Sequence, residues 1–332
     1  MHASSTHSTD TAAAQLLLLD KHAVEAALVP DDVLAAVREA FVLHSHREGR
    51  VFPVIREKLA TGGVFGIKAG DIGRQGLLGF KAAGFWPGNR ERGGEPHQAT
   101  ILLIDPATGR PICMLDGNAI TTARTGAAGG IGLQALARQD SRRVCIFGTG
   151  VQARVQLSYA LRLMPTLTDV RYVSASGTPS TSFENEFAGR CNLALATDRN
   201  AAVADSDVVI TATPGKGALF DADAVQAGTH FTCVGADTAG KRELPPGVLE
   251  RARIVVDDLD QARSIGECQW AQDEACIEIG DLLTGAAAIE RQPADITVFD
   301  MTGLALQDLT VARFLHERAL ANGAGTRLAW PW

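Results

Sequence analysis

Hydrophobic residues follow two spacings in the first part of the chain. Between positions 23 and 46 they recur every three or four residues, which predicts helix, with Pro30 and two following acids as a helix start. Short runs with β-branched residues come next, at 51–55, 64–68, 78–82, 100–104 and 111–115. These runs predict a mostly antiparallel sheet, and the alanine- and glycine-rich segment at 119–138 predicts a closely packed helix.

A different pattern begins at Arg143. Short apolar runs at 144–147, 170–174, 193–196, 207–212, 230–235, 253–257 and 296–299 are separated by stretches long enough for helices. This alternation predicts a Rossmann-type, doubly wound parallel sheet in an α/β protein. The last helical stretch, 306–321, is expected to return to the first part of the chain. We therefore predict a Rossmann domain at 126–305 and a discontinuous α+β domain at 1–125 and 306–332.

The loop after the first strand of this second region has glycine where a dinucleotide-binding turn requires it. Gly148 stands where the chain must turn sharply, and Gly150 where the backbone must approach a pyrophosphate. Ala153 is small enough for the next helix to pack on the strand. The motif alone is weak in a chain with 34 glycines, but the strand before it and the helix after it strengthen it. The cofactor contacts expected in this loop are Gly148, Thr149, Gly150, Val151 and Gln152.

The second strand should end on an acid if the adenine ribose keeps a free 2′-hydroxyl. Here it ends without Asp or Glu, and the hydroxyls of Ser174, Ser176 and Thr178 could hold a 2′-phosphate or form only a polar turn. NADP or dual use of NAD(P)H is therefore favoured over strict NAD. Further cofactor contacts are expected where the fourth and fifth strands end, at Thr211, Ala212, Thr213, Val234 and Gly235.

Four cationic side chains, Arg56, Lys68, Lys81 and Arg124, stand inside apolar or small-residue stretches. A buried cation is costly unless it is paired, and glycine and alanine around Lys81 and Arg124 leave room for a ligand. A substrate carboxylate, which arginine binds in bidentate fashion, is one partner. Structural salt bridges are the alternative, and they fit Lys68 best.

Asp237 follows the fifth strand, where its carboxylate could stabilise a cationic carbon–nitrogen centre or handle its proton. Capping a helix or a turn is the alternative. His97, at the start of a strand, could contact substrate or make a structural hydrogen bond. The other histidines show no metal-ligand spacing, so no metal is expected, and His44 and His46 are interpreted as a solvated helix end.

Charge and composition narrow the class of protein. The net charge is −7 and no lysine- or arginine-rich stripe is present, which disfavours nucleic acid as a partner. No apolar run reaches the roughly 20 residues of a membrane helix. The six cysteines form no CxxC pair and are interpreted as buried thiols in a reducing compartment. A cytoplasmic protein without a membrane partner is predicted.

Several segments together resemble the ornithine cyclodeaminase/mu-crystallin family, over about residues 23–316. They are Phe-Lys-Ala at 80–82, His-Gln-Ala at 97–99, Asp-Pro-Ala-Thr-Gly at 105–109, Thr-Thr-Ala-Arg-Thr-Gly-Ala at 121–127, the loop at 148–153, Gly-Ala-Asp-Thr-Ala-Gly-Lys-Arg-Glu-Leu at 235–244 and Phe-Asp-Met-Thr-Gly-Leu-Ala-Leu-Gln-Asp at 299–308.

The resemblance implies roles for residues that chemistry alone had marked. Arg56, Lys81 and Arg124 would bind the substrate carboxylate, with His97 as a further substrate contact, and Lys81 and Asp237 would form the acid/base pair. Thr125, next to Arg124, is added to the cofactor contacts. The family also implies a homodimer built through the first sheet, so that residues 1–125 and 306–332 would bind substrate and dimerise.

The segments at 84–89, 264–269 and 302–308 are most similar to the iminosuccinate reductase branch of the family. We therefore expect NAD(P)H-dependent reduction of a small α-imino acid, iminosuccinate to aspartate, reversible as an amino-acid dehydrogenase. A dicarboxylate needs a second cation, for which Arg56 opposite Arg124, helped by His97 and Gln98, is the candidate. One alternative is an ornithine or lysine cyclodeaminase with bound NAD, disfavoured by the missing acid. Another is a non-catalytic mu-crystallin-like protein that binds NADPH.

Overall fold

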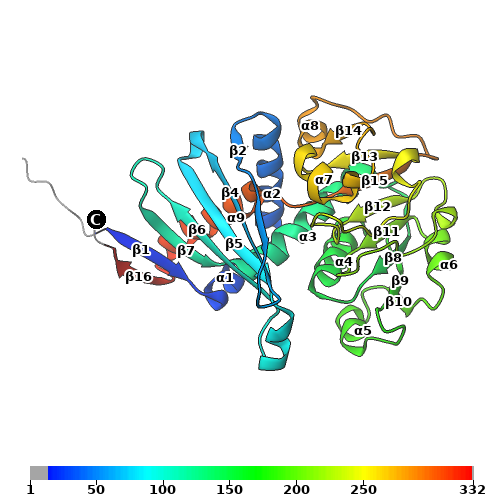
Figure 1. Ribbon diagram of the computed structural model, residues 1–332, viewed down its shortest axis with the longest axis horizontal. Coiled ribbons are helices and arrows are strands. Elements are labelled where there is room, and N and C mark those ends of the chain that lie inside the picture. Colours follow the sequence, from blue (N-terminus) through cyan, green and yellow to red (C-terminus); the bar gives the residue numbers. More distant parts are fainter. Residues whose placement is uncertain (1–13, 331–332) are drawn as a thin grey trace, which may run out of the picture.

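The computed structural model describes residues 14–330, which form two β-sheets with helices packed on and between them (Figure 1). The first sheet follows the order β16-β1-β7-β6-β5-β4-β2, and β3 also pairs with β4. Its strands are β1 (Gln15–Leu19), β2 (Gly49–Val51), β3 (Ile55–Lys58), β4 (Val64–Ile72), β5 (Leu77–Phe85), β6 (His97–Ile104), β7 (Pro111–Asp116) and β16 (Thr326–Ala329).

Neighbouring strands of the first sheet are antiparallel except for β1 and β7, in agreement with the mostly antiparallel sheet predicted from the short β-rich runs. The single strand predicted at 51–55 is wrong. The chain makes two short strands there, β2 and β3, which pair with opposite ends of β4. Pro53 lies between them and has no N–H to donate to a ladder, which explains the break.

One face of the first sheet is covered by helices that bring segments far apart in the sequence together. One core contains strand residues such as Leu17 and Ile101 together with helix residues from both ends of the chain, such as Phe41 and Leu309. The helical segment predicted at 23–46 contains two helices, and the helix start predicted at Pro30 is confirmed, since the chain extends at Leu28 and Val29 before it. The helices of this part are α1 (Lys21–Ala27), α2 (Pro30–Ser45), α3 (Gly117–Leu136) and α9 (Ala305–Asn322).

The second sheet is parallel throughout and follows the order β10-β9-β8-β11-β12-β15-β13-β14. Separate apolar cores cover its two faces. Its elements are β8 (Arg143–Phe147), α4 (Val151–Leu163), β9 (Asp169–Val173), α5 (Thr181–Phe187), β10 (Asn192–Leu195), α6 (Arg199–Ala204), β11 (Val208–Thr211), β12 (His230–Cys233), β13 (Ala252–Val256), α7 (Leu259–Ile265), β14 (Cys276–Glu278), α8 (Ile279–Thr284) and β15 (Ile296–Asp300).

Helix α3 lies between the two sheets (Figure 1). Asp116 accepts a hydrogen bond from the N–H of Ala119 and so begins the helix. Its glycines allow the close approach that the sequence predicts: a Cβ at Gly126 would meet Tyr159 of α4, and one at Gly132 would meet Phe299 of β15. The predicted boundary at 125/126 falls inside this continuous helix.

The α/β class and the doubly wound sheet are confirmed. The strand order reverses between β8 and β11, so the edge where these two strands end is a place where ligands bind in such folds. Strands β1, β14 and β16 were not predicted. No helix within residues 14–330 is long and apolar enough to cross a membrane.

Candidate functional site

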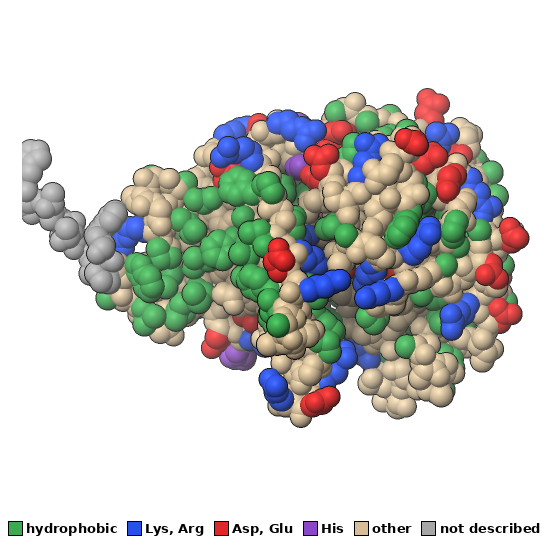
Figure 2. All heavy atoms as spheres, viewed as in Figure 1, with side chains coloured by type: hydrophobic (Ala, Val, Ile, Leu, Met, Phe, Trp, Pro, Cys, Tyr) green, Lys and Arg blue, Asp and Glu red, His purple; other side chains and the backbone are tan. Residues whose placement is uncertain are grey.

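A cavity of about 200 Å³ opens between the two sheets. Eight residues that the sequence selects line it together: Arg56, Lys81, His97, Arg124, Thr125, Gln152, Val234 and Asp237. They come from three strands, two helices and the segment after β12, so only the fold brings them together. Figure 2 shows Lys and Arg side chains around the hollow between the two halves of the molecule.

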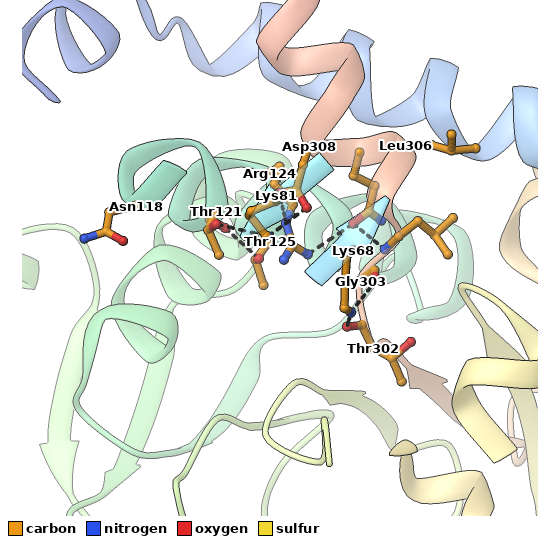
Figure 3. A network of polar contacts seen from close by, with 12 residues as sticks. Lys68, Lys81, Asn118, Thr121, Arg124, Thr125, Thr302, Gly303, Leu306 and Asp308 are labelled. Carbon is orange, nitrogen blue, oxygen red and sulfur yellow. Dashed lines mark hydrogen bonds and ion pairs between the residues drawn. The ribbon is translucent and has the colours of Figure 1, made fainter. Parts of the chain in front are cut away.

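The floor of the cavity is a buried charge network centred on Asp308 (Figure 3). One oxygen of its carboxylate lies 2.7 Å from Lys81 Nζ, and the other accepts a hydrogen bond from Arg124 Nε at 3.1 Å. Arg124 Nη1 donates to Gln307 at 3.1 Å, and Lys81 Nζ donates to the Thr121 hydroxyl at 3.1 Å. Asp308 stands in the first turn of α9, where the helix dipole favours a negative charge.

Burial lowers the pKa of Lys81 to about 7, against the opposing effect of Asp308, and the Arg124 guanidinium adds to the decrease. Lysine at such a pKa exchanges protons near neutral pH, which suits it to acid/base work. Asp308 keeps a pKa below its usual value despite its burial, because Lys81 and Arg124 stabilise the carboxylate. Asp308 was not predicted as a site residue, although it is the last residue of the family segment at 299–308.

Lys68 lies opposite Lys81 on the neighbouring strand β4 and also lines the cavity. Its Nζ donates to the backbone carbonyls of Thr302 and Gly303, at 2.7 and 2.6 Å. Burial, together with the Arg124 guanidinium, lowers the pKa of Lys68 to about 8. Gly303 has a φ of +85°, and a Cβ there would meet the guanidinium of Arg124, so glycine is required. Lys68 thus ties the turn before α9 to the first sheet.

Asp237 reaches the cavity from the segment that follows β12. Its Oδ2 accepts a hydrogen bond from Arg56 Nη2 at 3.3 Å, and its Oδ1 lies 3.5 Å from Lys241 Nζ. Partial burial raises the pKa of Asp237, but the charges of Arg56 and Lys241 outweigh this effect and hold the pKa below its usual value. The side chain is 42% exposed, so this carboxylate is accessible to a ligand.

His97 lines the cavity at the start of β6. Its Nδ1 lies 2.9 Å from Oδ1 of Asn118, whose amide donates to Glu95 and to the His97 carbonyl. Because that amide nitrogen donates, Oδ1 is the acceptor, and His97 carries its proton on Nδ1 when it is neutral. Burial and the charge of Lys81 lower the pKa of His97, which favours this neutral form.

The loop between β8 and α4 fits a dinucleotide. Gly148 has a φ of +106°, and a Cβ there would lie 2.6 Å from the carbonyl oxygen of Ala212, whereas a Cβ at Gly150 would meet nothing within 4 Å. Gly150 precedes helix α4 and has no side chain to cap it, and Val151 is 60% exposed, so the first N–H groups of the helix are open to a phosphate. The buried Gln152 Oε1 has no hydrogen-bond partner among the described residues.

The remaining predicted cofactor residues lie where β9, β11 and β12 end. Ser174 donates to the Thr178 carbonyl, and the hydroxyls of Ser176 and Thr178 are 2.7 Å apart. Thr213 donates to the buried Glu243 through both its N–H and its hydroxyl. Glu243 also packs against Gly235, and the sequence did not mark it. Thr149, Thr211 and Ala212 lie near this edge, and their roles stay predictions, as do the others.

His44 is not at a solvated helix end, and that interpretation is wrong. The residue is 6% exposed, and its Nε2 lies 3.1 Å from Asp258 and 3.6 Å from Glu278. These three side chains place possible metal-ligand atoms within 4.8 Å of one another. Burial opposes protonation, but the two carboxylates raise the pKa of His44 to about 9, which makes the ring their cationic partner.

The fold and the cavity define an α/β protein with a Rossmann-type sheet and a charged site between its two sheets. The ornithine cyclodeaminase/mu-crystallin family model matches residues 15–323, and the chain belongs to this family. The family that the sequence motifs indicated is therefore confirmed.

Two relatives match nearly the full length of the chain. Alanine dehydrogenase of Archaeoglobus fulgidus is 32% identical over 321 residues, which cover 95% of this chain and 98% of the relative. Iminosuccinate reductase of Paracoccus denitrificans is 31% identical over 319 residues, 93% and 98% of the two chains. The solved structure of the latter, in complex with NAD⁺, has a TM-score of 0.86 at 29% identity and covers 95% of this chain and 99% of that chain. An archaeal alanine dehydrogenase dimer with bound NAD has a TM-score of 0.88 at 31% identity, with the same coverage.

Proposed function

We propose that this protein is an NAD(P)H-dependent reductase of small α-imino acids, reversible as an amino-acid dehydrogenase, with iminosuccinate as its leading substrate. The observation that carries the proposal is the cavity, in which Lys81, Arg124 and Asp237 meet Thr125 and Gln152 beside the glycine loop. The two relatives described above, an alanine dehydrogenase and an iminosuccinate reductase, support the reaction class.

Arg124 would bind the α-carboxylate. Its Nε and Nη1 are held by Asp308 and Gln307, and no hydrogen bond within residues 14–330 engages Nη2, which leaves that amino group for the substrate. The guanidinium is thereby fixed before substrate arrives, and preorganisation of this kind saves the entropy of ordering a long side chain. Arg56, now on Asp237, would exchange part of that contact for a substrate carboxylate.

Lys81 and Asp237 would manage the proton on the substrate nitrogen. With a pKa of about 7, protonated Lys81 can polarise the imino acid and donate, and the Asp237 carboxylate can stabilise the cationic C=N–H centre. The bound dinucleotide supplies hydride to the imine carbon. In the reverse direction, neutral Lys81 accepts the proton from the amino acid.

The charge of the cavity favours a dicarboxylate. Among the described residues, the lining contains four permanently or partly cationic groups, Arg56, Lys68, Lys81 and Arg124, against one carboxylate, Asp237. Two buried carboxylates, Asp308 in the floor and Asp257 near Lys68, offset part of this charge. The remaining positive charge suits the two carboxylates of iminosuccinate better than the single carboxylate of iminopyruvate, the imine that an alanine dehydrogenase reduces.

The test is a screen of NADH and NADPH oxidation with oxaloacetate or pyruvate plus ammonia, and with Δ¹-pyrroline-2-carboxylate. We expect the highest kcat/KM with oxaloacetate and ammonia. Lys81→Met and Asp237→Ala should each lower kcat by at least about a hundredfold, a typical contribution of a positioned acid or base. Lys58→Met, which changes an exposed lysine on β3, is the matched control. Near-normal kcat in both site variants would refute the assignment.

The same screen includes ornithine and lysine with NAD⁺. Formation of proline or pipecolate with release of ammonia and no net change of cofactor would instead establish a cyclodeaminase. Tight cofactor binding without turnover of any substrate would establish a binding protein. The two structures compared above contain NAD, whereas the hydroxyls of Ser174 and Ser176 could hold the 2′-phosphate of NADP. Measuring the reaction with both NADH and NADPH therefore decides which cofactor is preferred.

We also propose a homodimer through the open face of the first sheet. Leu18, Met114, Leu102 and Phe80 occupy successive register positions across β1, β7, β6 and β5. Met114 is 39% exposed and the other three are partly exposed, and Figure 2 shows an apolar surface over these strands. An apolar stripe of this length on a sheet favours burial against another sheet. The dimer of the archaeal alanine dehydrogenase supports a dimeric state.

A further inference from the structure

A short turn, Glu267–Trp270, holds the segment that follows Asp237. Glu267 Oε1 accepts the N–H groups of Glu243 and Leu244, at 2.6 and 3.3 Å. The side chain of Gln269 accepts the N–H of Gly240 at 2.7 Å and donates to the Lys241 carbonyl at 2.9 Å. Trp270 Nε1 donates to that same carbonyl. We call residues 267–270 the brace and residues 240–244 the braced segment.

The braced segment begins three residues after Asp237 and contains Lys241, whose Nζ lies 3.5 Å from the Asp237 carboxylate. Five hydrogen bonds from the brace thus fix the backbone on which this ion pair depends. Side chains of the brace bind the backbone of the braced segment, so a shift of the brace backbone would move or break these hydrogen bonds. A misplacement of about 1 Å can cost a reaction two orders of magnitude.

The brace also contains one half of a thiol pair. Sγ of Cys268 lies 3.9 Å from Sγ of Cys276, and the described chain brings no other two thiols into contact. Cys268 is fully buried, and its N–H donates to Asp300. Cys276 is half-buried at the start of β14, the strand at the edge of the parallel sheet. The segment between the two cysteines is largely exposed, so Cys276 can approach Cys268.

We propose that Cys268 and Cys276 are an oxidisable dithiol, and that their disulfide displaces the brace and so loosens the braced segment, whose Lys241 pairs with Asp237. A disulfide requires the sulfurs to move from 3.9 Å to about 2.05 Å. The movement is divided between the edge strand and the brace, and the brace carries its contacts with it.

A peroxide is the oxidant, and Cys276 is the attacking residue because it is the more accessible thiol. The Cys268 thiol, pointing at Cys276, lowers the pKa of Cys276. The Cys276 thiolate attacks one peroxide oxygen, takes it as a sulfenic acid, and water leaves after proton uptake. Cys268 sulfur then attacks that sulfur, the S–O bond breaks, and the proton from Cys268 completes a second water. Two thiols and one hydrogen peroxide give one disulfide and two waters.

The first experiment tests the chemistry without reference to activity. The full-length protein is treated with hydrogen peroxide, alkylated, digested and analysed by mass spectrometry. We expect a peptide pair joined through Cys268 and Cys276, lacking two hydrogens and separated by dithiothreitol. Absence of that link under conditions that oxidise the half-buried Cys191 overturns the proposal.

The second experiment tests the coupling by hydrogen exchange of the amides of Gly240, Glu243 and Leu244, whose N–H groups the brace binds. Oxidation should speed their exchange by about tenfold in the wild type and in Cys191→Ser, and not in Cys276→Ser. A disulfide that forms without this change refutes the coupling. A reversible fall in kcat/KM is the third readout. Only that readout rests on the proposed function, so its failure alone counts against the reaction and not against the switch.

Discussion

Replacing Asp308 with asparagine tests whether one buried carboxylate sets the protonation of Lys81. The substitution keeps the shape of the side chain and removes the negative charge that lies 2.7 Å from Lys81 Nζ. Asp308 raises the pKa of Lys81, whereas burial and Arg124 lower it. Without the carboxylate, the pKa of Lys81 must therefore fall from about 7.

The size of the fall follows from the geometry. Both side chains are almost completely buried, at 5% and 1% exposure, so water screens the pair little. Removing one partner of a buried ion pair costs about 3–5 kcal/mol, and a shift of one pKa unit corresponds to about 1.4 kcal/mol. Because Thr121 still accepts from Lys81, we take the lower end and expect a shift of about two units.

The assay is the pH dependence of kcat/KM for imino-acid reduction, which reports groups of the free enzyme. Protonated Lys81 is the active form in this direction, so activity falls as pH rises through its pKa. In Asp308→Asn this alkaline limb should lie about two units lower, and in Asp308→Glu close to its original place. Asp71→Asn breaks the exposed pair with Arg50 and is the control. A folded Asp308→Asn protein with an unmoved limb would refute the reasoning.

Four further outcomes are expected. Gly148→Ala should lower the melting temperature, because its Cβ would lie 2.6 Å from a backbone oxygen, whereas Gly150→Val should leave melting unchanged and abolish dinucleotide binding measured by fluorescence. Ser174→Asp should raise the NADH-over-NADPH ratio of kcat/KM, since an acid there binds a 2′-hydroxyl and repels a 2′-phosphate. The pKa of His44 is raised to about 9, so its ion pairs contribute about 3 kcal/mol to the free energy of unfolding below pH 6.5, and this contribution is lost as pH rises to 9. The free energy of unfolding of His44→Gln, measured by urea denaturation, should lack this pH dependence. Met114→Glu should shift the mass measured by light scattering from dimer to monomer, by burying a charge in the apolar stripe.

The sequence alone predicts those site residues whose local sequence context is unusual. Lys81 and Arg124 stand among glycine and alanine, an unusual setting for a cation, and both line the cavity. Asp237 follows a strand of an alternating pattern, and the carboxyl ends of parallel strands meet at one edge. Each of these signals is local, so it survives in a single sequence.

The strands that were not predicted either pair with distant parts of the chain or are short edge strands. β1 pairs with β7 and β16, from distant parts of the chain, and β16 and β14 are short strands at sheet edges. Their residues alone resemble loops, because pairing with a preformed sheet decides their conformation. The split at Pro53 was readable, since proline cannot donate to a ladder, and the single strand predicted there ignored it.

Asp308 shows why a charge network escapes such reasoning. As an acid in the first turn of a helix it looks ordinary, and Arg124 stands 184 positions earlier. Only the return of α9 across the first sheet, where it packs on β4, β5 and β6, places that turn beneath Lys81. A chain ending after β15 would therefore lose more than apolar contacts. It would lose the buried counter-charge of Lys81 and Arg124, and the pKa of Lys81 would fall below about 7.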